Sequence, residues 1–366
     1  MAPGLDDFVY TGRRARIVFG VGRIASVRSE VERLGRSRVL LLSGAVLRSV
    51  GDRVADLLGE LCVGRFDGAV MHTPVSVTED ALGLLHALNA DCVVAVGGGS
   101  TTGLAKALAA RTDVDLIIAP STYSGSEVTP ILGETADGRK TTRATAAVLP
   151  ETVIYDVDLS RDMPVALSVS SAVNALAHAV EALYARDSNP AVDSWALESV
   201  RLLADGLRGL AGQPFATQVR SELLRGAWLA GMCLGSVSMA LHHKLCHTLG
   251  GTFGLPHAAT HAVVLPHAMA YNTAAVPQVM DALADAMSVD DAPGGVWDLV
   301  ARLDGPTSLA SLGLAAEDLD EAAEIASTAA YPNPRPITST GIRTLLDDAW
   351  HGRRPVVHAR REGGCE

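Results

Sequence analysis

The sequence is poor in several features that mark particular classes of protein. Aromatic residues make up only 4% of the 366 residues, although 48% are hydrophobic. Most of the core must therefore consist of Ala, Val and Leu, which suits packed helices and a buried parallel sheet. The chain is longer than one hydrophobic core usually supports, so we expect two domains that share a cleft.

Basic runs, long apolar runs and paired cysteines are also lacking. The formal net charge of -11 argues against a nucleic-acid partner. No apolar run reaches the roughly 18 residues of a membrane span, and the acidic N-terminus does not resemble a signal peptide. The five cysteines show no CxxC spacing, and an odd number cannot all be paired. We therefore expect free thiols, no membrane partner and a cytoplasmic protein.

Two hydrophobic patterns divide the chain near residue 160. Before it, short β-branched runs alternate with helix-length segments, which predicts a Rossmann-like parallel sheet with helices on both faces. The expected strands are 16–19, 39–42, 70–71, 92–96, 116–119 and 153–155, and the expected helices are 24–34, 45–61, 78–88 and 102–111. After it, Ala- and Leu-rich segments predict helices at 167–186, 191–210, 217–249, 279–286 and 319–328. We predict an α/β domain over 1–160, an all-α domain over 161–366, and an active site in the cleft between them.

Two loops of the first domain have the composition of a phosphate site. Residues 93–103 read as a buried strand, a glycine turn and a helix start, where close backbone approach and free N–H groups attract a pyrophosphate. The hydroxyl-rich loop 120–127 follows the next strand, at the same edge of the sheet. Either loop alone could be an ordinary turn, since the first matches neither GxGxxG nor a Walker loop. Together they predict a dinucleotide site formed by Ser43, Gly97, Gly98, Gly99, Ser100, Thr101, Ser121, Thr122 and Ser126.

The strand at 39–42 ends in Ser43–Gly44, without an acidic residue for the ribose 2′-hydroxyl. That leaves room for a 2′-phosphate, so we expect NADPH to be accepted as well as NADH.

Histidines are concentrated in one part of the second domain. Six of the eleven lie within 28 residues: His242, His243, His247, His257, His261 and His267. His243 and His247 are four apart and share a helix face. For His242, His261 and His267 a core or surface role is the simpler interpretation.

A second group lies upstream, where Asn174, His178 and Glu181 share one helix face at i, i+4 and i+7. A helix pair that brings His178 to His243 and His257 would build a three-imidazole centre. Such a centre suits a divalent metal or a reacting oxyanion.

With these motifs the sequence resembles the iron-containing alcohol dehydrogenase superfamily, whose fold is shared with dehydroquinate synthase, and within it the maleylacetate reductases. The resemblance is carried by 19–22, 71–74, the loop at Gly97, 123–127, 174–181, 242–257, 265–267 and 333–336. It implies reduction of the conjugated C=C bond of maleylacetate to 3-oxoadipate with NADH or NADPH. It also implies a homodimer that acts in the degradation of aromatic compounds.

The resemblance further implies a set of ligand positions. Metal-dependent members use an Asp and three His, and the matching positions here are Asn174, His178, His243 and His257. Replacing the one anionic ligand by Asn weakens the attraction for a hard divalent cation, and maleylacetate reductases share that substitution and are regarded as working without metal. We therefore expect no metal; if one is bound, these four residues hold it.

In this interpretation the imidazoles stabilise an enolate. His178, His243 and His257 donate hydrogen bonds to its oxygen, Asn174 orients them, and His243 or His247 supplies a proton to carbon. The dicarboxylate substrate needs further contacts, for which the candidates are Lys244, Arg143, Arg335 and Tyr123. Where these reductases commonly carry Gly-Arg-Asp before Arg-Val-Leu-Pro, residues 142–150 differ, so the substrate could be a relative of maleylacetate.

Three other functions are compatible with these motifs. A metal-dependent alcohol or aldehyde dehydrogenase of the same family would bind a cation through the three histidines. A dehydroquinate synthase-like lyase would need an acidic metal ligand and a phosphate-binding Lys/Arg set, neither of which is evident. A binding protein that kept the nucleotide site would have no use for an intact histidine cluster. Net consumption of added NADH separates a reductase from the lyase and from the binding protein.

Overall fold

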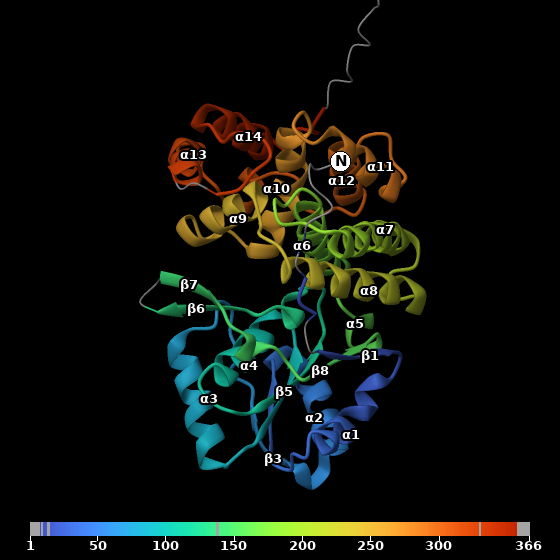
Figure 1. Ribbon diagram of the computed structural model, residues 1–366, viewed down its shortest axis with the longest axis vertical. Coiled ribbons are helices and arrows are strands. Elements are labelled where there is room, and N and C mark those ends of the chain that lie inside the picture. The colour runs from blue at the N-terminus through green and yellow to red at the C-terminus, as the bar shows by residue number, and fades with distance from the viewer. Residues whose placement is uncertain (1–7, 9, 13–14, 137–138, 329–330, 357–366) are drawn as a thin grey trace, which may run out of the picture.

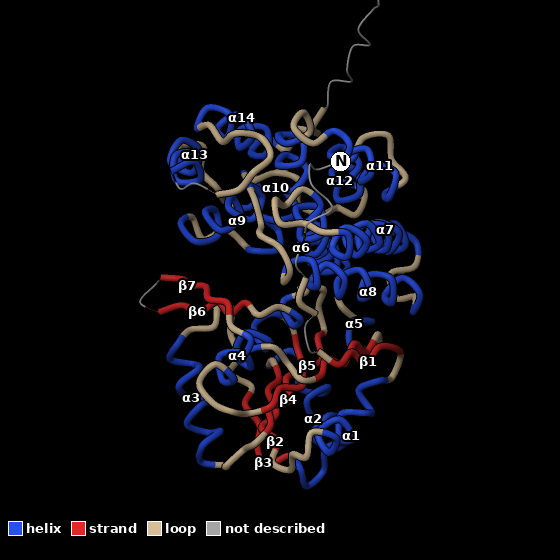
Figure 2. Tube along the Cα trace, in the orientation of Figure 1, coloured by secondary structure: helices blue, strands red, loops and turns tan. Residues whose placement is uncertain are grey.

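The computed structural model describes residues 8, 10–12, 15–136, 139–328 and 331–356. An α/β half and a helical half are stacked along the long axis of the molecule, and the chain passes from the first to the second near residue 160 (Figure 1). The strands are confined to the first half (Figure 2). The predicted fold class is thus confirmed.

The α/β half is built on a six-stranded sheet whose paired strands all run parallel. Its order is β1-β8-β5-β4-β2-β3. The strands are β1 (Arg16–Gly20), β2 (Val39–Ser43), β3 (Cys62–Phe66), β4 (Cys92–Gly97), β5 (Asp115–Pro120) and β8 (Thr152–Asp156). Because all carboxyl ends meet at one edge, the loops after β4 and β5 are neighbours there.

Helices cover both faces of this sheet, as the sequence predicts. In β2, Val39 and Leu41 pack against α1 (Val27–Arg33) and α2 (Arg48–Leu58). Leu40 and Leu42 face the other side, against α3 (Val75–Ala87) and α4 (Gly99–Ala109). The continuous run of apolar residues in β2 therefore serves two cores, one on each face.

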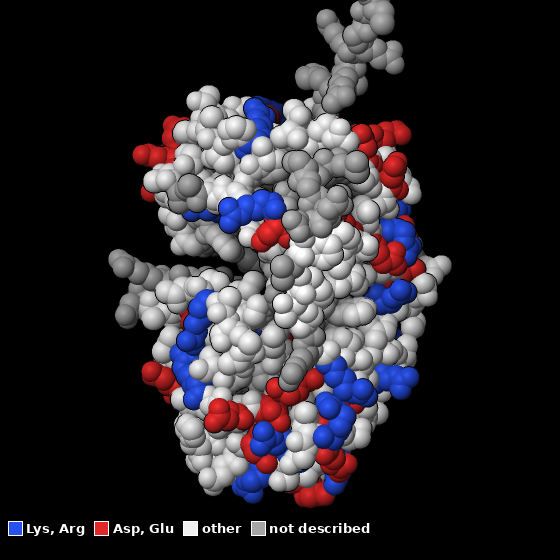
Figure 3. Space-filling model, in the orientation of Figure 1, with Lys and Arg blue, Asp and Glu red and all other residues white. Residues whose placement is uncertain are grey.

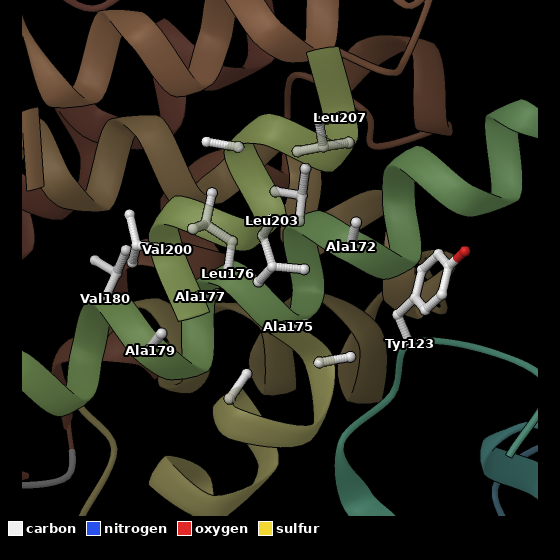
Figure 4. Packing of buried hydrophobic residues seen from close by; sticks show 14 of the residues in the cluster. Tyr123, Ala172, Ala175, Leu176, Ala177, Ala179, Val180, Val200, Leu203 and Leu207 are labelled. Carbon is white, nitrogen blue, oxygen red and sulfur yellow. The ribbon is translucent and has the colours of Figure 1, made fainter. Parts of the chain in front are cut away.

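The helical half is organised around α6 (Val165–Leu183). It follows the short α5 (Asp158–Arg161), and the other helices are α7 (Pro190–Gly212), α8 (Thr217–Leu234), α9 (Leu241–Thr252), α10 (His257–Asn272), α11 (Pro277–Met287), α12 (Ala292–Ala301), α13 (Asp318–Thr328) and α14 (Ser339–His351). By length and composition α6 could cross a membrane, but 83% of its apolar stretch is buried inside the protein. Its Ala and Leu side chains face Val200, Leu203 and Leu207 of α7 (Figure 4). Therefore α6 is a core helix.

Several predicted elements are wrong in position. Residues 70–71 form no strand, and the sixth strand is β3. The helix predicted over 45–61 is α2 with a 3₁₀ turn at each end. Gly59, with φ 58, ends α2 in a conformation that L side chains rarely adopt, so the chain turns into β3 earlier than the pattern indicates.

Other elements escaped prediction. The antiparallel hairpin β6 (Ile131–Ala136) and β7 (Arg139–Ala144) is rich in Thr, Arg and Lys, so it lacks the apolar alternation of a half-buried strand. The single helix predicted over 217–249 is divided into α8 and α9 by a turn that starts at Gly235. Helices α10, α12 and α14 were also not anticipated.

Candidate active site

The glycine-rich loop joins β4 directly to α4. A Cβ atom on Gly97 would lie 2.4 Å from Oγ1 of Thr101, and one on Gly98 would lie 3.0 Å from Cγ2 of Thr122. A Cβ on Gly99 would meet no heavy atom within 4 Å outside its own helix backbone. Gly97 and Gly98 are thus required for packing, while Gly99 borders open space at the N-terminus of α4, where a pyrophosphate could lie.

The hydroxyl-rich loop lies against this glycine loop. The Ser121 N–H donates to the Gly97 carbonyl at 2.9 Å. Farther along, the buried Lys106 of α4 donates from Nζ to the carbonyls of Thr129 (2.7 Å) and Ile131 (3.0 Å). The two predicted cofactor loops are therefore in contact, and Lys106 fixes the segment into which the second loop continues.

Ser43 has an acidic neighbour that sequence reasoning missed. Its hydroxyl donates to Oδ1 of Asp67 at 2.6 Å, and Asp67 follows β3, the strand paired with β2. The sequence placed the neighbouring strand at 70–71, so Asp67 was not considered. An acidic group therefore stands at this edge of the sheet, although β2 itself provides none.

The structure brings the predicted histidines together from three helices. Asn174 and His178 lie on α6, His243 and His247 on α9, and His257 opens α10. The rings of His178 and His243 stack with centroids 5.1 Å apart, and those of His243 and His247 are 6.4 Å apart. The cluster that the spacing predicted is therefore present as a geometric unit.

His261 links His257 to this cluster. Its ring centroid is 4.5 Å from that of His257 and 5.3 Å from that of His243. His261 is buried, and its Nδ1 lies 2.9 Å from Nε2 of His242, which is also buried. The core role expected for these two histidines is consistent with their burial, but they lie directly against the candidate catalytic imidazoles.

Cys246 completes a second group of donor atoms. Its Sγ is 3.6 Å from Nε2 of His242, and the donor atoms of Cys246, His242 and His261 all lie within 4.8 Å of one another. Two of the nitrogens share a hydrogen bond, while Nδ1 of His242 and Nε2 of His261 are buried without a partner among the described residues.

Glu181 makes contacts that the sequence did not indicate. It is completely buried one turn after His178. Its Oε2 accepts hydrogen bonds from Nδ1 of His243 (2.8 Å) and from the Ala240 N–H (2.7 Å), and its Oε1 accepts one from the His242 N–H (2.7 Å). The i+7 spacing from Asn174 was the only signal for it.

Burial keeps several of these imidazoles neutral. It lowers the pKa of His178, and the neighbouring imidazoles of His243, His257 and His247 lower it further. The pKa of His242 and of His261 is lowered for the same two reasons. At neutral pH these rings therefore act as neutral hydrogen-bonding groups.

Three polar atoms of these residues lack a hydrogen-bond partner in the protein. Asn174 Oδ1, His178 Nδ1 and His243 Nε2 are buried and have no hydrogen-bond partner in the part of the chain that the structure describes. The donor set at the family's ligand positions consists of three imidazoles and one amide, and it includes no carboxylate. A set without a carboxylate attracts a divalent cation less strongly than one that includes an anionic oxygen ligand.

The predicted substrate contacts are less closely grouped. Lys244 follows His243 on α9 and is partly exposed. Arg335 lies 4.1 Å over the ring of Tyr271 and donates to its carbonyl. Arg143 lies on the hairpin, pairs with Glu134 and is 53% exposed. The surface is hollowed between the two halves beside this hairpin (Figure 3).

Tyr123 must be withdrawn from the substrate contacts. It is completely buried beside the core residues of α6 (Figure 4), and its hydroxyl accepts a hydrogen bond from the buried Arg220 at 3.2 Å. Its place is in the packing between the loop and the helical half, because no part of the side chain reaches solvent.

Comparison with known proteins identifies the family of the chain. Residues 14–157 match the model for iron-containing alcohol dehydrogenase, and residues 168–350 match the C-terminal model of the Fe-containing alcohol dehydrogenase family. Maleylacetate reductase 1 of Rhodococcus opacus is 66% identical over 97% of this chain and 99% of its own length. The crystal structure of maleylacetate reductase from Agrobacterium tumefaciens superposes with a TM-score of 0.93 at 50% identity, covering 96% of this chain and 100% of that one. An iron-containing alcohol dehydrogenase from Corynebacterium glutamicum gives 0.91 at 38% identity, covering 95% and 98%.

Proposed function

The chain belongs to the iron-containing alcohol dehydrogenase family, and we propose that it reduces the conjugated C=C bond of maleylacetate to 3-oxoadipate with a nicotinamide cofactor. The observation that carries this proposal is the match to proteins named maleylacetate reductase along nearly the whole chain. The histidine cluster supports it, since His178 and His243 are buried and an enolate oxygen needs hydrogen-bond donors away from water.

The cofactor, when bound, supplies the hydride. We assign its pyrophosphate to the loop at Gly97–Gly99, because Gly99 opens on unfilled space at the N-terminus of α4. Ser121 and Thr122 border the same loop and are assigned to the same ligand. NADH and NADPH are both candidates. The Asp67 carboxylate beside Ser43 could accept a hydrogen bond from the ribose 2′-hydroxyl of NADH, so the kcat/KM values for the two cofactors are the quantities to compare.

The imidazole cluster is assigned to the substrate. Nδ1 of His178 is buried without a protein partner in the described part of the chain, so this nitrogen is available to the oxygen on which negative charge develops. Burial makes each such hydrogen bond stronger than it would be in water. His257 and His247 complete the cluster, and Asn174 provides an amide beside them.

We further propose that this reaction needs no resident metal. The four positions that hold a cation in metal-dependent members carry no negative charge here, because Asn174 stands at the aspartate position. A metal-dependent dehydrogenase acting on alcohols or aldehydes is the alternative.

The carboxylates of the substrate are assigned to two basic residues. Lys244 follows His243 in α9, and Arg335 lies over the ring of Tyr271. The homodimer and the cytoplasmic location stay predictions from the resemblance.

The substrate class is tested by offering the purified protein freshly generated maleylacetate, simple aldehydes and alcohols in parallel, each with NADH and with NADPH. We expect net cofactor oxidation and 3-oxoadipate with maleylacetate alone. Turnover only of aldehydes or alcohols would move the protein to the alcohol dehydrogenase alternative. No net cofactor consumption would favour the lyase.

A further inference from the structure

The strongest unassigned feature of the site is the carboxylate of Glu181. We propose that Glu181 is a positioning residue for the reduction: it fixes the tautomer and the ring orientation of His243, so that Nε2 is the nitrogen presented to the substrate. This inference rests on the proposed function for its catalytic meaning, but its structural content can be measured without any turnover.

The first step of the argument is the hydrogen-bond chemistry of the pair. An ionised carboxylate can only accept, so Nδ1 of His243, 2.8 Å from Oε2 of Glu181, must carry the proton. When the ring is neutral this is its one N–H, so Nε2 is then the bare nitrogen, able to accept a proton but not to donate one. Nε2 is buried without a partner among the described residues, and its ring stacks on that of His178.

The second step is that the carboxylate cannot easily rotate away. Oε2 also accepts from the Ala240 N–H, and Oε1 accepts from the His242 N–H, both at the start of α9. Glu181 thus caps α9 from another helix, and the positive end of the α9 dipole stabilises its charge. One buried side chain holds both the first turn of α9 and the imidazole that this turn carries.

The third step concerns what an isosteric amide would do. In Glu181→Gln one oxygen becomes an NH₂ group, which cannot accept a hydrogen bond. At the Oε2 position the NH₂ would face Nδ1 of His243 and drive the ring proton to Nε2, and it would also oppose the Ala240 N–H. At the Oε1 position it would instead oppose the His242 N–H and loosen the start of α9.

The experiment combines nitrogen NMR with kinetics. Long-range ¹H–¹⁵N spectra of protein labelled with ¹⁵N-histidine report the tautomer of each ring, and His243 is assigned by difference from His243→Gln. We expect the Nδ1–H tautomer in the unmodified protein and a gain of Nε2–H in Glu181→Gln. With maleylacetate, kcat of Glu181→Gln should fall at least about tenfold, while KM for the cofactor changes little.

Glu30→Gln is the matched control. Glu30 is also a buried carboxylate, but it binds Arg16, Arg33 and Thr152 at the opposite edge of the sheet. We expect this variant to lose stability and to keep both kcat and the His243 tautomer.

An Nε2–H tautomer in the unmodified protein would overturn the proposal even if Glu181→Gln failed to fold. An unchanged kcat in folded Glu181→Gln would overturn it as well. Absence of maleylacetate turnover in the unmodified protein would instead count against the proposed function and leave the tautomer result standing.

Discussion

The side chain at position 174 determines whether the histidine cluster includes a negative charge. It lies on the same face of α6 as His178, and its Oδ1 is buried without a partner among the described residues. A carboxylate at this position would give the imidazole cluster the anionic ligand that a divalent cation favours. The residue is therefore the simplest place to convert the site from one chemistry to the other.

We predict that Asn174→Asp creates a metal site. Its affinity for Zn²⁺ or Co²⁺ should rise at least about tenfold over the unmodified protein. The metal-independent reduction of maleylacetate should fall, because a buried charge then opposes the developing enolate. Metal content after dialysis, compared with Asn174→Leu, measures the first effect. Equal metal content in all three proteins would contradict it.

His178 is predicted to act on the transition state. In His178→Gln, loss of one donor to the substrate oxygen should lower kcat about 100-fold. The dissociation constant for the cofactor, followed by fluorescence, should stay within about twofold, since His178 lies on α6 and not on the loops assigned to the cofactor. If kcat were preserved, His178 would be a packing residue only.

At the level of single residues, the sequence predicted helix faces but not contacts between different elements. Helix periodicity predicted the faces that carry His178 and His243, whereas the meeting of these two with His257 was expected only if the helices packed suitably and from the resemblance. Glu181 and Asp67 were not assigned, because their partners lie on other elements whose pairing appears only in the fold. Tyr123 was misassigned for the same reason: its partner Arg220 is distant in sequence.

Among the elements, the turn from β4 into α4 is the one most directly tied to the cofactor. Its three glycines differ in their surroundings, which allows packing to be separated from ligand binding. Gly97 touches Thr101, whereas Gly99 has open space in front of it.

We predict opposite effects for alanine at these two positions. Gly99→Ala should keep or slightly raise stability, because alanine favours the helix, but should raise KM for the cofactor several-fold, about fivefold or more. Gly97→Ala should lower the free energy of unfolding, because its Cβ would meet Oγ1 of Thr101. Urea unfolding and cofactor titration measure the two effects. An unchanged KM in Gly99→Ala would move the pyrophosphate elsewhere.

The elements that sequence patterns found are those with strong apolar patterns, such as β2 and α6. The missed ones depend on contacts between segments. The polar hairpin is held by partners outside itself: Glu134 pairs with Arg111 at the end of α4, and the Thr135 N–H donates to the Thr73 carbonyl. Such contacts leave no periodic signal in the local sequence.

At the scale of the whole molecule, the two halves are joined by buried polar contacts. Arg220 of α8 is completely buried and donates to Ser168 Oγ (2.7 Å) and the Met163 carbonyl (2.9 Å) as well as to Tyr123. The backbones of Gly125 and Gly231 also touch, leaving no space for a Cβ on Gly231. These contacts fix the cofactor loops relative to the histidine cluster.

Buried histidines predict a loss of stability in mild acid. Burial lowers the pKa of His267 from 6.5 to about 4, an effect that Asp348 partly offsets. As the pH falls below 6.5 the unfolded chain binds a proton at this residue and the folded chain does not, so the free energy of unfolding decreases down to about pH 4. His178, His242 and His261 are shifted in the same direction and add to the effect.

Urea unfolding at neutral pH and near about pH 5 measures this dependence. For His267 alone the full window is on the order of 3 kcal/mol, and His267→Asn should remove that part of the slope. The matched control is His351→Asn, on the half-exposed surface of α14. Identical slopes in all three proteins would contradict the prediction.

The account as a whole rests on reduction of a conjugated double bond at a histidine cluster that works without metal. The most direct test follows cofactor oxidation by protein stripped with chelator, supplied with freshly generated maleylacetate, with and without added Zn²⁺ or Fe²⁺. We predict full turnover after stripping and no stimulation by either cation. Activity that disappears on stripping and returns with metal would contradict this account.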